Sequence, residues 1–443
     1  MQIAAALRTQ VAAGVLLPGE RVASTRTLAT QLGVSRGSVV TAYEQLTAEG
    51  YLTAEVGSGT VINPLLPHAR APRPEPAPIP AAEPELVSLT PGLPDTAGIL
   101  TPEWRAAWRA AAVDPSGDLP REVAAHLRHM RGLNVDPTRI LITAGARDGL
   151  SVLLRALGRP LRVGVESPGY PSLRRVPQAL GHTLLEIPTG RDGVTVSTAD
   201  LDALIVTPSH QYPYGGSLPA ARRAELVEWA RAHDALLIED DFDSELRHVG
   251  QPLPALATLQ PSHTVLLGTF SSVMTSALAC GYLIVPPRLV PVIRDHRRAT
   301  GQPVGALVQH ALASYLETGA LRRRTQRLRQ VYRRRRQLVI DTLADVDGTE
   351  LLPINGGLHA VLVIDPTSHA SFCGAADPHA TSSELEASLV RSCAAHGIGV
   401  RALSRYWGGE GAKHGIVLGF GRLSDEVLTA ALEQVARIIR AER

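Results

Sequence analysis

The chain has 443 residues, a formal net charge of +2 from 44 Lys plus Arg against 42 Asp plus Glu, and three cysteines. Its length is typical of two or three domains. Its net charge is close to zero, so the total charge gives no evidence for a nucleic-acid partner. The cysteines are too scattered for a disulfide framework or a zinc motif, and no apolar run reaches the roughly 20 residues of a membrane helix. We therefore expect a cytoplasmic protein without a membrane partner.

The first 63 residues predict a small DNA-binding fold. Apolar spacing, capping residues and turn glycines indicate three helices and a hairpin, over residues 1–13, 25–32 and 36–49 and around Gly57-Ser58-Gly59. Ser24 or Thr25 can cap the second helix and Ser35 the third. This order of elements is typical of a winged helix-turn-helix.

A proline-rich stretch and an alternating pattern define the rest of the chain. Residues 64–84 contain eight prolines in 21 positions, which is typical of an extended, semi-rigid linker. Beyond it, apolar runs alternate with helical stretches such as residues 220–233, which predicts a mainly parallel α/β sheet. The expected strands lie at residues 139–143, 161–166, 203–207, 235–239 and 264–267.

The N-terminal segment LPGERVASTRTLATQLGVSRGSVVTAYEQLTAEGYL resembles the GntR family of bacterial transcription regulators, through its R-x-L-A-x-x-L-G-V-S-R core. The resemblance implies double-stranded operator DNA as partner. It places DNA contacts at Arg26, Ser35, Arg36, Ser38 and Gly57. Residues 1–63 hold four arginines and four glutamates, so one copy should bind weakly and a dimer on two half-sites is expected. The alternative is a winged helix that docks another protein.

The larger part resembles the aminotransferase-like domain of the MocR subfamily of GntR regulators. The resemblance rests on segments that recur in the same order: LTPGLPD, ILITAGARDGL, VESPGYPSLR, VTPSHQYPYGG, LIEDDFDSELRHVGQPLPAL, LLGTFSSVMTSALACGYLIVP and IVLGF. It implies an α/β fold like that of fold type I transferases dependent on pyridoxal 5'-phosphate (PLP), and a head-to-tail homodimer. The expected organisation is a winged helix-turn-helix (1–63), a linker (64–88) and an aminotransferase-like effector-binding and dimerisation domain (89–443).

The resemblance also implies a ligand pocket. Asp240 would pair with the pyridinium nitrogen of PLP, Tyr170 would stack on its ring, and His210 would form part of the wall. The turn at Gly145 and Ala146 could bind a phosphate through its amides. The expected lining comprises Gly145, Ala146, Arg147, Tyr170, His210, Asp240, Phe242, Thr269, Ser271 and Ser272. A divalent-metal site at Glu239, Asp240, Asp241 and Asp243 is the alternative for this acidic run, but no second cluster of ligands supports it.

Several positions depart from the family's pattern. Ser272 stands where the lysine would form a Schiff base with PLP, and Ala279 where an arginine would bind the phosphate. Phe242 replaces a tyrosine that would contact the ring hydroxyl, and Tyr214 replaces a small hydroxyl residue. The chain's one lysine, Lys413, lies in a glycine-rich loop that is not preorganised for such a bond. We therefore expect no covalent PLP, with non-covalent PLP or another effector as the open alternatives.

Three further features have two interpretations each. Arg147 could supply positive charge to the phosphate site, or pair with Asp148 or with solvent. The arginine-rich helix at residues 322–337 could contact DNA, but we favour a face turned to solvent or to a dimer partner. His126 and His129 have metal-ligand spacing without a third ligand, so we expect surface histidines.

The sequence thus predicts a MocR-type transcription regulator that senses an effector by binding linkage and is not an enzyme. Two alternatives remain open at this point. One is an active PLP-dependent aminotransferase fused to a DNA-binding module, and the other is a constitutive DNA-binding protein with an inert dimerisation domain.

Overall fold

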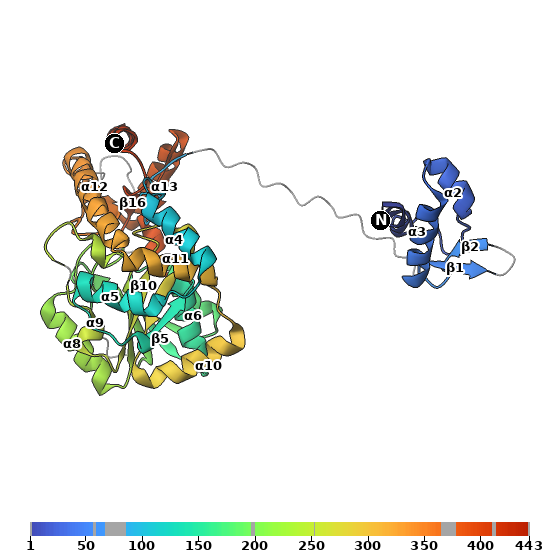
Figure 1. The fold of residues 1–443 in the computed structure, drawn as a ribbon. Coiled ribbons are helices and arrows are strands. Elements are labelled where there is room, and N and C mark those ends of the chain that lie inside the picture. The colour runs from blue at the N-terminus through green and yellow to red at the C-terminus, as the bar shows by residue number, and fades with distance from the viewer. Residues whose placement is uncertain are drawn as a thin grey trace. The chain divides into compact units, whose positions relative to one another are not determined.

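The computed structural model of the chain describes residues 2–55, 59–66, 86–195, 200–251, 253–364, 378–409 and 413–441. The chain forms two compact units, Met1–Glu83 and Pro84–Arg443 (Figure 1). Within the described residues, no helix has the length and apolar character needed to cross a bilayer. Each unit is described by itself below.

The N-terminal unit is the predicted winged helix-turn-helix. Its elements are α1 (Gln2–Ala12), α2 (Thr25–Leu32), α3 (Arg36–Ala48) and the antiparallel strands β1 (Leu52–Glu55) and β2 (Gly59–Ile62). Ser24 caps α2 by accepting from Thr27 N at 3.1 Å, and Ser35 caps α3 by accepting from Ser38 N at 3.2 Å. The three helices and both caps are confirmed, whereas Gly57 lies outside the described residues.

One face of α3 holds this small unit together. Val39, Ala42, Tyr43 and Leu46 of α3 are buried with Ile62 of β2, and the Tyr43 hydroxyl donates to Ala23 O at 2.8 Å. The first turn of α3 lies outside this core and is exposed. The helix therefore packs through its middle and leaves its N-terminal end free.

The second unit is built on an eight-stranded sheet in the order β4-β11-β10-β9-β8-β5-β6-β7. The central run from β10 to β6 is parallel, while β11 and the short β7 pair antiparallel. All five strands expected from the sequence are present. The strands are β4 (Ile140–Thr143), β5 (Arg162–Ser167), β6 (Thr183–Gly190), β7 (Gly193–Val194), β8 (Ala203–Val206), β9 (Leu236–Asp241), β10 (Thr264–Thr269) and β11 (Gly281–Ile284).

Helices cover both faces of this sheet. Alternate residues of β9 point to opposite faces, so Leu236 and Ile238 pack with α6, α7 and α10, and Leu237 packs with α8 and α9. The buried core also takes in α4, α5, α11 and α12. The helices are α4 (Pro102–Val113), α5 (Leu119–Arg131), α6 (Ala146–Ala156), α7 (Pro171–Ala179), α8 (Ala220–Ala232), α9 (Leu256–Leu259), α10 (Val290–Thr300), α11 (Ala306–Glu317) and α12 (Ala320–Leu343).

A smaller antiparallel sheet closes the C-terminal part. It has the order β12-β13-β16-β15, formed by Thr349–Leu351, His359–Ile364, Gly415–Gly419 and Arg401–Ala402, and α13 (Pro378–Ala395) and α14 (Asp425–Ala441) pack near it. The first strand after the proline-rich stretch, β3 (Val87–Ser88), pairs in parallel with β14 (Ile398–Gly399). The chain therefore enters this unit by joining its C-terminal part.

Gly268 allows a close approach in the strand that leads into the candidate site. It lies in β10 opposite Tyr282 of β11, and a Cβ on Gly268 would lie 2.1 Å from Cζ of the Tyr282 ring. Tyr282 is buried in the core, so its ring has little room to move aside.

We expect Gly268→Ala to lower the free energy of unfolding by about 1–3 kcal/mol, because the added methyl overpacks against the Tyr282 ring. Gly190→Ala is the matched control, since nothing lies within 4 Å of its Cβ position. Urea denaturation of both variants measures the difference. Equal midpoints for the two variants would show that the ring is not held at Gly268.

Candidate functional site

A buried carboxylate stands at the end of the central strand β9. Asp240 is 3% exposed, its Oδ1 is buried, and none of the described residues gives the carboxylate a hydrogen bond. Burial, reinforced by Asp241 and then Asp243, raises the pKa of Asp240 well above its ordinary value. Buried polar atoms are almost always satisfied, so an unpartnered carboxylate here indicates a place for a ligand that donates a hydrogen bond.

The neighbouring carboxylates have separate protein partners. Asp241 forms an ion pair with Arg131, Asp243 lies 2.7 Å from Nδ1 of His210, and Glu239 accepts from Ala257 N at 3.3 Å. Within the described part of the chain, no group of three or more His, Cys, Asp or Glu is arranged to hold a metal ion. The acidic run therefore offers no support for the metal alternative.

Aromatic rings cluster around Phe242, two residues after Asp240 in the sequence. His210 stacks on Phe242 at a centroid distance of 5.8 Å, and its Nε2 is buried without a partner among the described residues. Tyr170, at the N-terminal end of α7, packs edge-on against Tyr212 at 5.1 Å and remains 41% exposed. Tyr170, His210 and Phe242 are thus joined through one cluster that includes Tyr212, with the exposed Tyr170 ring at its margin.

The start of α6 has free backbone donors. Gly145 precedes the helix with a φ of 87°, and within the described part of the chain no side chain caps the amides of the first turn. Asp148 instead accepts from Ala144 N at 2.9 Å and from Arg297 at 2.7 Å. A helix N-terminus with free amides favours an anion such as a phosphate.

Arg147 lies at this same helix start. Its side chain is exposed and forms no ion pair or hydrogen bond with the described residues. Asp148 is occupied by Arg297, so the expected alternative of an Arg147–Asp148 pair is wrong. The guanidinium is free to meet an anion at the amides of α6.

The turn between β10 and β11 runs beside the start of α6. A Cβ on Gly281 would lie 3.0 Å from Gly145 Cα, and Ala279 two residues earlier has a φ of 43°. The methyl of Ala279 has no charge to offer a phosphate. The amides of α6 and Arg147 are therefore the identified donors on this side.

Ser272 lies in the loop that follows β10. Thr269 Oγ1 donates to Ser271 Oγ at 3.0 Å and accepts from Ser271 N at 3.1 Å, while the hydroxyl of Ser272 donates to Phe242 O. Phe242, Thr269 and Ser272 line a cavity of about 20 Å³, which is room for about one water molecule. The loop carries hydroxyl groups and no amine.

The only lysine of the sequence lies over an aromatic ring. Nζ of Lys413 lies 5.7 Å from the centroid of the Tyr214 ring. Tyr214 packs with Trp407 and with the buried cluster that contains Val417. Lys413 thus has an aromatic partner outside the Ser272 loop.

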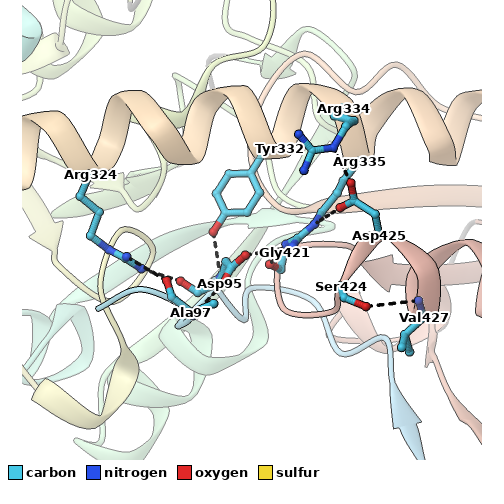
Figure 2. Close-up of polar contacts among 10 residues, drawn as sticks. All are labelled: Asp95, Ala97, Arg324, Tyr332, Arg334, Arg335, Gly421, Ser424, Asp425 and Val427. Atoms are coloured by element: carbon cyan, nitrogen blue, oxygen red, sulfur yellow. Dashed lines mark hydrogen bonds and ion pairs between the residues drawn. The ribbon is translucent and has the colours of Figure 1, made fainter. Parts of the chain in front are cut away.

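Several buried groups were not predicted from the sequence. His126 is 6% exposed and bonds Glu245 at 2.7 Å, so the expectation of a surface histidine is wrong for His126, although His129 is exposed. Glu166, whose pKa burial raises to about 7, accepts from Thr207 and was not singled out. On α12, Arg324 and Arg335 are buried, so the expected solvent- or partner-facing position is wrong for both (Figure 2).

The candidate DNA contacts gather at the helix-turn-helix. Arg26, at the start of α2, and Ser35, Arg36 and Ser38, at the start of α3, are all exposed. Arg8 is paired with Glu49, whereas neither Arg26 nor Arg36 forms an ion pair with any described residue. Two unpaired guanidinium groups and a helix N-terminus suit the phosphates and base edges of DNA.

Comparison with known proteins decides the family. The model of bacterial regulatory proteins of the gntR family matches residues 1–62, and that of class I and II aminotransferases matches residues 113–404. The chain is 53% identical to the HTH-type pyridoxine biosynthesis transcriptional regulator PdxR of Corynebacterium glutamicum, across 98% of this chain and 94% of that protein. It is 30% identical to the probable rhizopine catabolism regulatory protein MocR of Rhizobium meliloti, across 75% of each. The chain belongs to the MocR subfamily of GntR-type transcription regulators.

The solved structures extend this result to the fold of the second unit of this MocR-type regulator. An archaeal alanine:glyoxylate aminotransferase aligns with a TM-score of 0.69 at 22% identity, covering 80% of this chain and 91% of that one. The predicted fold class, a winged helix-turn-helix followed by a fold type I domain, is confirmed. At this identity the likeness shows the fold alone.

A buried histidine beside the site gives a pH prediction. His359 bonds Pro213 O through Nε2 at 3.0 Å, and burial, with a smaller effect of His210, lowers its pKa to about 3. The native state therefore binds fewer protons than the unfolded state, whose histidine titrates near 6.5, and stability falls as the pH drops through this range.

We expect His359 to remove about 2 kcal/mol of unfolding free energy between about pH 7.5 and about pH 5. Between these two pH values, the unfolding free energy of His359→Gln should fall by about 2 kcal/mol less than that of the wild type. The variant His129→Gln changes an exposed histidine and should follow the wild type. Urea denaturation at the two pH values measures this. A pH dependence shared by all three proteins would mean that His359 is protonated in the native state.

Proposed function

We propose that this MocR-type regulator senses a pyridoxal-type phosphate held without a covalent bond, and that it regulates genes of pyridoxine biosynthesis from the cytoplasm. The identification of the pathway is supported by the relative from Corynebacterium glutamicum, which is named as a regulator of pyridoxine biosynthesis. The mode of binding is supported by the residues at the end of β9 and at the start of α6.

The observation that carries the proposal is the buried Asp240 carboxylate, whose Oδ1 receives no hydrogen bond from the described residues. When bound, PLP supplies a pyridinium N–H for a carboxylate and a phosphate for cationic and amide donors. Asp240 fits the first group, and the amides of α6 with Arg147 fit the second. Tyr170 and His210 would flank the ring, and Thr269 and Ser271 would offer hydroxyl groups to the phosphate.

Ser272 and Ala279 set the expected strength of binding. A serine hydroxyl cannot form an imine, and the methyl of Ala279 cannot replace a charge-assisted phosphate contact worth about 1.5–3 kcal/mol. Loss of that contact alone weakens binding about 10- to 150-fold. We therefore propose reversible binding, as suits a sensor whose occupancy follows the ligand concentration, and no aminotransferase activity.

We expect incubation with PLP followed by borohydride to leave the mass of the denatured wild-type chain unchanged. Ser272→Lys is the matched variant, because it places an amine in the loop after β10, and we expect it to gain the mass of one reduced pyridoxyl phosphate group. Mass spectrometry reads both proteins. A modified Lys413 in the wild type, or amino-group exchange between an amino acid and a keto acid, would favour the aminotransferase alternative instead.

We propose that DNA binding requires two copies of the winged helix. We propose that residues 1–63 bind DNA, that residues 64–88 act as linker, and that residues 89–443 sense the effector and form a head-to-tail homodimer. With equal numbers of arginines and glutamates in residues 1–63, one copy has little net attraction for phosphates. Two copies on two half-sites would supply the affinity that a single copy lacks.

Arg36→Ala should weaken binding to the promoter of a regulated gene about 5- to 150-fold, which corresponds to the loss of about 1–3 kcal/mol from one base or phosphate contact. Arg8→Ala is the control, because the Arg8 guanidinium is occupied by Glu49. Fluorescence anisotropy with a labelled promoter fragment measures the affinities. If Arg8→Ala weakened binding as much as Arg36→Ala, the start of α3 would not be the contact surface.

A further inference from the structure

Helix α12 buries two arginines on its inner face. Arg324 and Arg335 are 3% and 5% exposed, and Tyr332 between them is fully buried. Figure 2 shows all three pointing from α12 toward the segment around Asp95 and Ala97. Buried arginines need partners for their N–H groups, and here the partners are mainly backbone carbonyls of other segments.

Arg324 joins two segments that are far apart in the sequence. Its Nε donates to Val273 O at 2.8 Å, while its two terminal nitrogens donate to Ala97 O at 3.3 Å and Asp95 O at 2.5 Å. Val273 directly follows Ser272 in the candidate ligand loop. One guanidinium therefore holds both this loop and the segment 95–97.

The same segment is held from a second direction. Asp95 N donates to the Tyr332 hydroxyl at 2.8 Å, and Asp95 Oδ2 pairs with Arg335 at 2.9 Å. Arg335 also donates to Gly421 O at 2.5 Å and to Asp425 Oδ1 at 3.0 Å (Figure 2). The segment is thus fixed to α12 and to the start of α14.

Segment 95–97 lies close to the place where the chain comes from the DNA-binding unit. The described chain resumes at residue 86, β3 (Val87–Ser88) pairs with β14, and Leu89 N donates to Gly399 O at 2.9 Å. Only a few residues separate this strand from Asp95. Segment 95–97 is therefore close in the sequence to β3, the first described strand after the proline-rich stretch.

We propose that Arg324 is the positioning residue that transmits ligand binding from the loop at Ser272 to segment 95–97, and from there to the DNA-binding unit. This inference rests on the proposed function, since it needs a ligand at the Ser272 loop. The guanidinium has fixed, planar donor directions, so a shift of Val273 O cannot be followed without weakening the bonds to Asp95 O and Ala97 O. A ligand that moves or stiffens the loop then favours one position of segment 95–97 over another.

The test compares Arg324→Lys with Arg327→Lys in the full chain. Lysine keeps the charge and length but not the planar fork that reaches three carbonyls, and Arg327 lies one turn away on the exposed face of the same helix. Two affinities are measured for each protein: that of PLP, by calorimetry, and that of the promoter fragment, by anisotropy with and without saturating PLP.

We expect PLP to change the promoter affinity of the wild type and of Arg327→Lys about 5- to 150-fold, the usual range of allosteric coupling. In Arg324→Lys the change should fall below about twofold, while both affinities measured separately stay within about threefold of wild type. An undiminished response in Arg324→Lys, beside a responding wild type, would overturn the inference and leave the proposed function intact. A wild type whose promoter affinity ignores PLP would overturn both.

Hydrogen exchange on the wild type tests the same link without a variant. PLP should alter the exchange of peptides that cover residues 269–274 and of peptides that cover residues 86–97. A change confined to the first set would contradict the role of Arg324, even if Arg324→Lys did not fold.

Discussion

The second unit keeps a carboxylate at the end of its central strand, and no described residue gives its buried oxygen a hydrogen bond. Asp240 is surrounded by further acids, and the nearby donors bind other groups, since Arg131 pairs with Asp241 and the His210 ring lies against Asp243. An arrangement of this kind lowers the stability of the ligand-free protein and favours a ligand with an N–H donor. The roles assigned to the aromatic cluster, to the amides of α6 and to the loop after β10 all depend on a ligand that binds this carboxylate.

The same fold supports recognition and chemistry through different residues. An aminotransferase-like sheet positions Asp240 and the start of α6 because parallel strands end at one edge, where the helix N-termini also gather. Catalysis would additionally need an amine in the loop after β10, and this loop offers Thr269, Ser271 and Ser272. A shared fold therefore does not assign an activity by itself, and the residues at the site are what distinguish a sensor from an enzyme.

Much of the architecture was predictable because it depends on local patterns. Alternating apolar strands, the caps at Ser24 and Ser35, and the helix over residues 220–233 all follow from short-range rules, and the structure confirms them. The side-chain environments of the candidate pocket are less accessible to such rules. That Asp240 Oδ1 has no partner among the described residues, or that Asp148 pairs with Arg297, depends on contacts between distant segments.

The buried arginines of α12 show where the composition misled the prediction. A helix with nine arginines suggests a solvated face, yet Arg324 and Arg335 lie in phase with Leu328, Tyr332 and Val339 on the inner stripe of the helix. The positions of these arginines around the helix can be read from the sequence. The carbonyls of Asp95, Ala97 and Gly421, which accept hydrogen bonds from the buried guanidinium groups, cannot be identified from it. Position around the helix was a better guide here than charge.

Calorimetric titration of the full chain with PLP, wild type beside Asp240→Asn, tests whether Asp240 is the group that binds the ligand. We expect saturable binding of one PLP per chain by the wild type, reversed by dialysis, and at least about tenfold weaker binding by Asp240→Asn, since a charge-assisted hydrogen bond is lost. Equal affinities in the two proteins, or no saturable binding by the wild type, would contradict the account.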